Sequence, residues 1–428
     1  MTTATQARAA TGRGRSDRVA LLARPLCSYY LVIGSALLLL ALGLVMVLSA
    51  SSVRSYSASG SSFTVFARQV MWVAIGLPLM AVAMRLPPRA FRALAYPLLL
   101  ISFVGLVLVL VPGIGVTRNG SSRWLALGPI VAQPSELAKL ALVLWGADLY
   151  ARKEKLLGDW RHIVVPLLPV SMLLAALIML EPDMGTTMAM MAVVFGLLWV
   201  VGAPGRLFAL LATSGTALAA LLAVIEPYRF ARIASFTDPC SAAQRLEGGF
   251  QGCQGLYAIA SGGWFGVGLG ASRQKWTYLP NAHTDYIYAI IGEELGLFGT
   301  LFVLVLFGLL GYGGVRIAQR SRDPFVRLAA TGITAWLMVQ ALVNMGAVTG
   351  LLPITGIPLP LISFGGSSLG VSLFAIGMLV SFARHEPGAQ AALAARGASP
   401  VRRARRQVAR FYGFGPDVRR RGRAPAAR

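Results

Sequence analysis

Residues 29–50 read YYLVIGSALLLLALGLVMVLSA, an unbroken apolar run without a charged side chain. A helix of roughly 20 apolar residues crosses the hydrocarbon core of a bilayer, so this run predicts a transmembrane helix. Five arginines precede it within residues 1–27, as in the basic start of a signal peptide. No small-residue cleavage site closes the run, so we expect the helix to be retained.

The composition of the whole chain agrees with a membrane protein. Of its 428 residues, 56% are hydrophobic and 13% are charged, whereas soluble domains carry roughly 25% charged residues. These values exclude an ordinary soluble enzyme, a disordered chain and a disulfide scaffold. Because backbone polar groups must be paired within a bilayer, helices are the expected spanning elements. The predicted fold is an all-α polytopic membrane protein with ten transmembrane helices, at residues 29–50, 67–84, 93–112, 132–150, 163–180, 186–202, 207–226, 286–313, 325–347 and 366–383.

The distribution of Lys and Arg predicts the orientation of these helices. With a cytoplasmic N-terminus, the inner segments contain 29 of the 39 basic residues, as the positive-inside rule requires. Both termini then lie inside, and the long connection at 227–284 lies outside. The chain divides into a basic cytoplasmic tail at 1–28, a membrane domain at 29–383 and an Arg-rich cytoplasmic tail at 384–428.

The Arg-rich tail at 384–428 carries twelve arginines, a composition that also occurs in nucleic-acid-binding segments. Arginines next to a membrane helix anchor its orientation and contact anionic lipids of the inner leaflet. We favour this second interpretation and expect no nucleic-acid partner. Docking of a partner protein on the tails stays open.

The chain has three cysteines, and two of them, Cys240 and Cys253, lie thirteen residues apart in the outer loop. The exterior compartment can be oxidising, so a disulfide between them and two free thiols are both open. The spacing matches no zinc pattern, and the chain has only three histidines, so we do not expect a zinc site.

Charged side chains near membrane depth are informative, because each costs several kcal/mol unless it is paired or hydrated. Arg68 opens the second predicted span, where it either snorkels to the interface or faces a polar cavity. Arg123 ends a polar turn at 118–124. Asp183 precedes the sixth span, where it either caps the helix or also faces the cavity.

Two pairs of charged residues lie inside predicted spans. Glu136 and Lys139 are three residues apart on one face of the fourth span, and such a pair commonly faces a cavity or a polar ligand. Glu293 and Glu294 lie in the eighth span. If that helix starts at Asp285, Glu293 lies roughly 80° from its face and the next glutamate points the other way. We therefore expect one glutamate to face a cavity and the other to pack against another helix.

Asp285 ends the outer loop, in the stretch KWTYLPNAHTDYIYAIIGEELG at 275–296. Capping of the eighth helix is one interpretation of this aspartate. His283 and Thr284 lie beside it, and Arg273 and Lys275 shortly before it, which favours a functional interpretation.

The last outer connection, at 353–368, contains three prolines and four glycine or hydroxyl residues in a row near its end. Such a segment does not form a simple helix end. Gly365 and Gly366 allow backbone amides to approach an anion such as a phosphate, and Ser363 and Ser367 flank them. Under the predicted orientation all these polar elements lie in the external half, which predicts an outward-facing polar cavity.

Five motifs resemble the SEDS family (shape, elongation, division and sporulation). They cover essentially all ten predicted helices, and the fifth looks more like the FtsW branch than the RodA branch. The motifs are QPSELAK at 133–139, EPDMGT at 181–186, LPNAHTDYIYAIIGEELG at 279–296, LLPITGIPLPLISFGGSS at 351–368 and GWFGVGLGASRQKW at 263–276.

The resemblance implies a glycosyltransferase that polymerises lipid II, the undecaprenyl-pyrophosphate-linked disaccharide-pentapeptide, into peptidoglycan strands. The reaction would take place on the outer face of the bacterial cytoplasmic membrane during cell division, at the septum. The family's essential carboxylate corresponds to Asp285, and its cavity residues correspond to Arg68, Glu136, Lys139 and Asp183. The resemblance also implies a class B penicillin-binding protein as partner, with other division proteins as candidates for the tails.

The residues suit this chemistry. An aspartate, with an unperturbed pKa of about 3.9, is ionised at neutral pH and can act as general base on the acceptor hydroxyl. A single such carboxylate predicts inversion at the donor carbon. Basic side chains, the Ser/Gly-rich turn or a divalent cation (Mg or Mn) could neutralise the departing pyrophosphate. The candidate substrate-binding residues are Arg68, Arg123, Glu136, Lys139, Asp183, His283, Thr284, Glu293, Ser363, Gly365, Gly366 and Ser367.

Two other classes of function fit a polar cavity. A lipid II flippase would carry out no chemistry, but alternating access favours charged groups near the midplane, whereas these lie on one side. A non-catalytic division scaffold would tolerate substitution of Asp285. A division role is favoured over elongation or sporulation by the FtsW-like motif alone.

Overall fold

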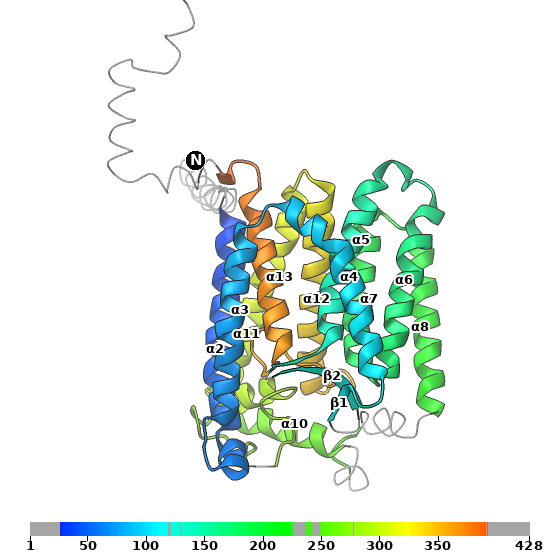
Figure 1. Ribbon diagram of the computed structural model, residues 1–428. Helices are drawn as coiled ribbons and strands as arrows, with labels where there is room; N and C mark the ends of the chain where they lie inside the picture. Colours follow the sequence, from blue (N-terminus) through cyan, green and yellow to red (C-terminus); the bar gives the residue numbers. More distant parts are fainter. Residues whose placement is uncertain are drawn as a thin grey trace, which may run out of the picture. The chain divides into compact units, whose positions relative to one another are not determined.

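The computed structural model describes residues 26–118, 121–128, 130–225, 236, 238–241, 249–276, 278–390 and 392. Most of both basic tails and much of the 227–284 connection lie outside these residues. Residues Cys27–Ala383 form one compact unit, a bundle of long helices (Figure 1). The long helices are α2 (Cys27–Ser59), α3 (Thr64–Arg85), α4 (Pro88–Leu110), α5 (Pro134–Arg152), α6 (Trp160–Leu180), α7 (Met184–Val201), α8 (Gly205–Ile225), α11 (Ile287–Arg320), α12 (Pro324–Val348) and α13 (Ser367–Arg384).

Each predicted span has one of these helices at its position. Eight of the helices are long and apolar enough to cross a membrane by length and composition. The other two are α5, which carries four charged residues along its length, and α8, whose last side chains lie outside the described part. The main differences are at the ends: α2 runs to Ser59 and α11 to Arg320, well beyond the predicted 50 and 313.

The segment between α4 and α5 is a small antiparallel sheet. Its strands are β1 (Gly115–Arg118), β2 (Ser121–Leu127) and β3 (Ile130–Ala132), in the order β1-β2-β3. The interpretation of 118–124 as a turn is therefore wrong for Ser121–Trp124, which belong to β2. The class of the protein remains all-α, and this small sheet is an addition that the sequence did not predict. The β2 sequence SSRWLAL does not alternate, since three polar residues precede four apolar ones, and Trp124 pairs with Val116 of β1.

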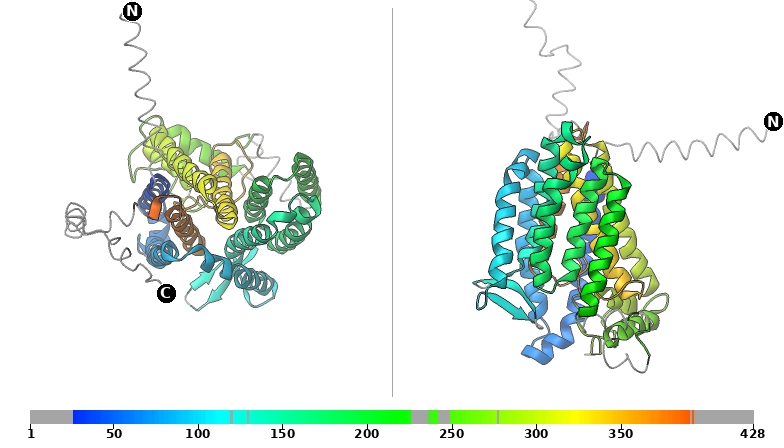
Figure 2. Two further views of the ribbon diagram at one scale, coloured as in Figure 1. Left: turned by 90° about the horizontal axis from the view of Figure 1, so that it is seen from above. Right: turned by 90° about the vertical axis from the view of Figure 1, so that its right-hand side faces the viewer.

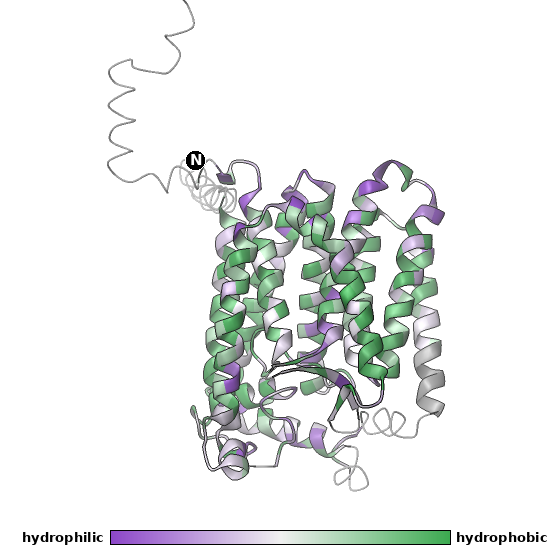
Figure 3. Ribbon diagram, viewed as in Figure 1, coloured by the Kyte–Doolittle hydropathy of each residue, from purple (hydrophilic) through white to green (hydrophobic). Residues whose placement is uncertain are grey.

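The two ends of the bundle carry different elements. The end that carries the sheet, the short helix α10 (Phe250–Gly262) and the 349–366 segment is called the α10 end here; it is the lower end in Figure 1. A still shorter 3-10 helix, η1 (Glu154–Leu156), lies at the opposite end, after α5. Hydropathy colouring shows apolar residues along the helices and hydrophilic residues mainly toward both ends (Figure 3). This distribution is the one a bilayer imposes on a helical bundle.

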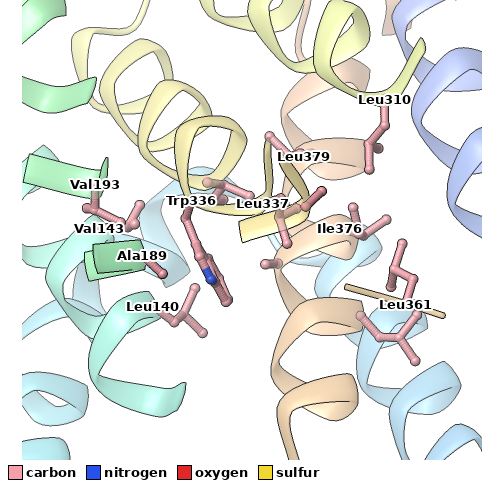
Figure 4. Close-up of a cluster of buried hydrophobic side chains, with 14 of the residues drawn as sticks. Leu140, Val143, Ala189, Val193, Leu310, Trp336, Leu337, Leu361, Ile376 and Leu379 are labelled. Atoms are coloured by element: carbon pink, nitrogen blue, oxygen red, sulfur yellow. The ribbon is translucent and has the colours of Figure 1, made fainter. Parts of the chain in front are cut away.

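Among the described helices, α5, α12 and α13 have the largest share of buried residues. Trp336 of α12 is fully buried among apolar side chains of α5 and α7, including Leu140, Val143 and Ala189 (Figure 4). The orange α13 lies beside the blue helices in Figure 2. A side chain at Gly377 would come within 2.6 Å of the Met80 carbonyl, so α13 and α3 approach closely through a small residue.

Helix α11 is broken at Gly296, whose φ of 67° lies in the left-handed region. The freed backbone groups near the break bond to the segment after α10: Val267 donates to the Glu293 carbonyl (2.9 Å) and Leu297 donates to that of Gly263 (2.9 Å). Cys240 and Cys253 form a disulfide. The connection before α11 is therefore fixed to the bundle by backbone bonds, in addition to the cross-link at α10.

Candidate active site

Asp285 lies in a turn before α11, not in the helix. Helix α11 begins at Ile287, and the capping position is Tyr286, so the capping interpretation of Asp285 is wrong. The turn is closed by the backbone bonds of Thr284 and Tyr286 to the Asn281 carbonyl (3.0 and 3.3 Å). Asp285 is half-buried, so this residue is partly exposed to the surroundings of the bundle.

The 349–366 segment runs along the turn that carries Asp285. Ser363 donates from Oγ to the Thr284 carbonyl (2.6 Å), and the Phe364 amide donates to the His283 carbonyl (3.0 Å). Gly356 has a φ of 71°, and a Cβ built on it would lie 3.7 Å from Oδ2 of Asp285. The segment therefore forms one wall next to the carboxylate, and Ser363 is a structural tie in that wall.

His283 and Thr284 support the turn. His283 is buried against the Phe364 ring at 5.7 Å. Burial, and then the positive charge of Arg54, lower the pKa of His283 to about 4, so its imidazole is neutral at pH 7. The Thr284 hydroxyl donates to the Asn281 carbonyl within the turn (3.1 Å).

Glu136 and Lys139 form a buried ion pair near the start of α5. Their side chains are 3% and 1% exposed, and Lys139 Nζ lies 2.8 Å from Oε1 of Glu136. Lys139 also donates to Oε1 of Gln340 (3.1 Å) and lies over the Trp336 ring at 5.0 Å from its centroid. The predicted pair is therefore present, and α12 supplies its other contacts.

Two amide side chains of α12 connect this pair to Asp285. Gln340 donates from Nε2 to the Pro358 carbonyl (3.0 Å). Asn344, one turn further along, donates to the carbonyls of Asp285 and Ile357 (2.7 Å each). Asp285 and Lys139 thus belong to one network of hydrogen bonds that passes through Gln340 and Asn344 of α12. Sequence reasoning missed both amides, although polar residues four apart inside an apolar span were a usable signal.

Arg123 and Asp183 meet at the junction of β2, α6 and α7. Asp183 caps α7 by accepting from the Thr186 amide (3.0 Å), and Arg123 Nη1 lies 3.7 Å from its carboxylate. Arg123 also donates to the carbonyls of Glu181 (3.0 Å) and Pro182. Its side chain is 24% exposed, so this guanidinium is anchored yet accessible.

Glu181 was not singled out from the sequence as a site residue. It is buried, and neither carboxylate oxygen has a hydrogen-bond partner. Burial and the negative charge of Asp183 raise its pKa to about 8, against a lowering effect of Arg123. The carboxyl is therefore protonated at pH 7, and the three side chains together are close to neutral.

Gln133 joins this junction to α13. Its side chain donates to Oδ2 of Asp183 (3.2 Å), and its backbone amide donates to Oγ of Ser367 (3.0 Å). Gly365 and Gly366 directly precede α13, and Gly366 has a φ of 55°. Ser367 is thus linked to Asp183 through Gln133, whereas Ser363 is hydrogen-bonded to Thr284.

The start of α7 touches the same wall as Asp285. A Cβ on Gly185 would come within 3.0 Å of the Thr355 carbonyl and closer still to the Ile357 side chain. Asp285 faces the next residue of that segment, Gly356. The start of α7, which Asp183 caps, and Asp285 therefore both approach one short stretch of backbone, residues 355–357.

Two predicted site residues lie elsewhere. Arg68 is exposed, while its neighbour Gln69 is buried and donates to the Ser363 carbonyl (3.4 Å). The exposed position of Arg68 agrees with the interpretation in which its side chain extends to the membrane interface. Glu293 accepts from the Ser272 hydroxyl and the Arg273 amide, so it holds the loop before Asp285 rather than lining a cavity with it.

Glu294 packs against another helix, as one of the two glutamates was expected to do. Ser49 of α2 donates to both of its carboxylate oxygens (2.6 and 2.8 Å), and Lys275 lies 3.5 Å away. Among the described residues, no three His, Cys, Asp or Glu side chains lie close enough together to hold a metal ion. Of the acidic groups at this end, Asp183 caps α7, and Glu293 and Glu294 accept hydrogen bonds from neighbouring segments.

A helical bundle with lipid-facing apolar surfaces and a polar network at one end defines a polytopic membrane protein with a site at one membrane face. The family of cell cycle proteins that comprises FtsW, RodA and SpoVE matches residues 29–387. The chain belongs to this family, which confirms the resemblance seen in the motifs.

Named members are similar over most of the chain. The probable peptidoglycan glycosyltransferase FtsW of Mycobacterium tuberculosis is 47% identical over 385 residues, which cover 90% of this chain and 73% of that protein. A solved structure that describes the coordination of polymerization and crosslinking by a peptidoglycan synthase complex is 30% identical, with a TM-score of 0.67, covering 82% of this chain and 96% of that one. The rod shape determining protein RodA of Thermus thermophilus is 28% identical, with a TM-score of 0.61, covering 83% and 97%.

Proposed function

We infer that this chain is a peptidoglycan glycosyltransferase of the FtsW type, which polymerises lipid II into glycan strands. Membership of the family and 47% identity to a probable peptidoglycan glycosyltransferase support the activity. The observation that carries the mechanism is the carboxylate of the half-buried Asp285, placed against Gly356 at the polar α10 end.

We propose that the α10 end faces the exterior. The distribution of basic residues supports this orientation, because 29 of 39 belong to segments that connect the helices at the other end or to the two tails. The disulfide between Cys240 and Cys253 at the α10 end agrees with an oxidising compartment. Lipid II would then reach the site from the outer leaflet.

In the proposed reaction Asp285 is the general base. Its carboxylate accepts the proton of the acceptor hydroxyl while that oxygen bonds to the anomeric carbon of the donor. The bond from this carbon to the pyrophosphate breaks, and undecaprenyl pyrophosphate leaves with the electron pair. The proton on Asp285 then passes to solvent. A positioned base of this kind contributes about 10²–10⁴-fold to the rate, and attack opposite the leaving group inverts the donor carbon.

Arg123 is the better candidate for binding the pyrophosphate than Lys139. Lys139 is 1% exposed and already paired with Glu136 at 2.8 Å. Arg123 is 24% exposed, and its distance of 3.7 Å from Asp183 leaves room for a second anion. An anchored guanidinium gains most from an oxygen pair of a phosphate, because it offers two parallel donors.

A class B penicillin-binding protein is the proposed partner, and the division septum the proposed location. The similar solved complex couples polymerization with crosslinking, and the FtsW name of the relative favours division. Docking of other division proteins on the tails is a proposal that concerns residues mostly outside the described part.

The experiment is a gel analysis of products from the purified full-length chain and lipid II, with and without a class B penicillin-binding protein. We expect polymer from the wild type, and none from Asp285→Asn although that variant still binds lipid II. Asp238→Asn, in the same connection and exposed, is the matched control and should polymerise normally. A wild type that moves lipid II across vesicles without making polymer is a transporter. An active Asp285→Asn variant contradicts the assignment of the base.

A further inference from the structure

Asn344 is a buried amide in the apolar interior of α12, with a side chain 2% exposed. A side-chain amide has two N–H donors, and both are used: one reaches the Asp285 carbonyl and the other the Ile357 carbonyl, at 2.7 Å each. Two carbonyl acceptors fix which end of the amide is nitrogen. The opposite oxygen, Oδ1, is buried without a hydrogen-bond partner.

The two carbonyls belong to different segments, and neither segment is helical. Asp285 lies in the turn before α11, and Ile357 lies in the 349–366 segment between α12 and α13. Near a bilayer such irregular backbone needs partners from the protein. Asn344 supplies one partner to each segment from a single rigid helix. It therefore sets the distance between the Asp285 turn and the segment that contains Gly356.

That distance matters for the carboxylate. Gly356 presents its Cα toward Oδ2 of Asp285, with 3.7 Å from the ideal Cβ position to the oxygen. Two other bonds join the segments, at Thr284 and His283, but both lie before Asp285 in the chain. Asn344 holds the residue that bears the carboxylate itself.

The amide has a cost as well as two bonds at this position. A buried acceptor without a partner destabilises the fold, and Oδ1 of Asn344 is such an acceptor. The two N–H bonds offset this cost by pairing carbonyls of two non-helical segments. An apolar side chain would remove the unpaired oxygen but would leave both carbonyls without this donor, so a test must separate the stability of the fold from the position of Asp285.

We propose that Asn344 is a positioning residue for the glycosyl transfer: its amide clamps the backbone of Asp285 to that of Ile357 and so aims the Asp285 carboxylate at the acceptor hydroxyl. The proposal rests on the function inferred above. Asn344 touches no reacting atom in this arrangement, so its removal should slow the chemical step and leave substrate binding nearly intact.

The test compares Asn344→Leu and Asn344→Asp, both close in size to asparagine and unable to donate two N–H bonds. The matched control is Thr334→Val on the same helix, because Thr334 is also buried but donates only to the Ala330 carbonyl of its own helix. Each full-length variant is assayed for lipid II polymerisation over a range of substrate concentrations, and its folded fraction and melting temperature are measured in parallel.

We expect kcat per folded molecule to fall on the order of 10²-fold in both Asn344 variants, the effect of displacing a catalytic group by about 1 Å. KM should change by less than about threefold, because ground-state binding is not removed. Thr334→Val should keep its kcat. A purely structural role would lower the melting temperature and the folded fraction while kcat per folded molecule stays constant.

The outcomes separate this proposal from the function on which it rests. If the wild type polymerises lipid II and Asp285→Asn does not, the function stands; an unchanged kcat in either folded Asn344 variant then overturns the clamp alone. If Thr334→Val also loses kcat, and by as much as the Asn344 variants, the clamp is overturned as well. A wild type that yields no polymer with its partner present overturns both.

Discussion

Breaking the buried pair of Glu136 and Lys139 tests whether these charges stabilise the protein or serve the reaction. The Lys139→Met variant removes the cation but keeps the length of the side chain. The Glu136 carboxylate would then be left in a site where its side chain is 3% exposed, and where Oε2 already has no hydrogen-bond partner. Gln340 would also lose a donor to its Oε1.

The expected loss is large for one substitution. Removing one member of a buried ion pair costs about 3–5 kcal/mol, because the remaining charge is buried without compensation. At roughly 2.1 cal/mol/K of unfolding entropy per residue, 1 kcal/mol corresponds to about 1–1.5 °C for a chain of this size, so we expect the melting temperature to fall by about 3–8 °C. The double variant Glu136→Gln/Lys139→Met buries no charge, and such replacements are often neutral. Its melting temperature should return close to that of the wild type.

The assay is thermal unfolding of the purified chain in detergent, followed by lipid II polymerisation with the folded material. We expect the double variant to be stable yet slower by at least about tenfold, because it loses the Lys139 donor to Gln340, and Gln340 holds the Pro358 carbonyl of the segment beside Asp285. A double variant as unstable as Lys139→Met would show that the two residues are not coupled. A stable double variant with full activity would refute this supporting role of the pair.

Three other predictions concern groups outside this pair. Asp148 is fully buried and paired with Arg92 and Arg152 at 3.0 and 2.7 Å. The Asp148→Asn substitution should lower the melting temperature without changing kcat per folded molecule. Glu181→Gln should raise the melting temperature at pH 7–8 but not near pH 4.5. Burial raises the pKa of the Glu181 carboxyl from 4.5 to about 8 in the folded state. Deprotonation of this residue in the unfolded chain therefore lowers the free energy of unfolding increasingly between pH 4.5 and pH 8, and by the full amount above pH 8. Reduction of the Cys240–Cys253 disulfide should speed proteolysis around α10, which peptide mapping detects, and an unchanged cleavage rate would count against it.

The spans could be predicted because the bilayer imposes a length and a composition that hydropathy reports directly. The sheet at 115–132 could not, since its strands are only four, seven and three residues long, and runs this short give a weak periodicity signal. The break of α11 at Gly296 was also hidden, because a glycine inside an apolar run does not by itself mark a helix break. It needs the segment after Gly262 to accept the freed backbone groups.

The site was predicted in part. Asp183 does cap its helix, and Glu136 does pair with Lys139, since both follow from local spacing. Capping by Asp285 failed because α11 starts two residues later. The sequence leaves Arg68 open between the membrane interface and a polar cavity, and in the structure Arg68 is exposed while its neutral neighbour Gln69 enters the bundle. Charge alone did not point to Gln69.

The burial of Gln69 points to how the site is built. Charged side chains at this depth satisfy one another, because an unpaired charge is too costly, so they are poorly placed to hold irregular backbone. Neutral amides do so at lower cost, each with two donors. Gln69, Gln340 and Asn344 all donate to carbonyls of the 353–366 range, at Ser363, Pro358 and Ile357. The wall beside Asp285 is thus held by amides from α3 and α12, and its geometry should depend more on these neutral residues than on the surrounding charges.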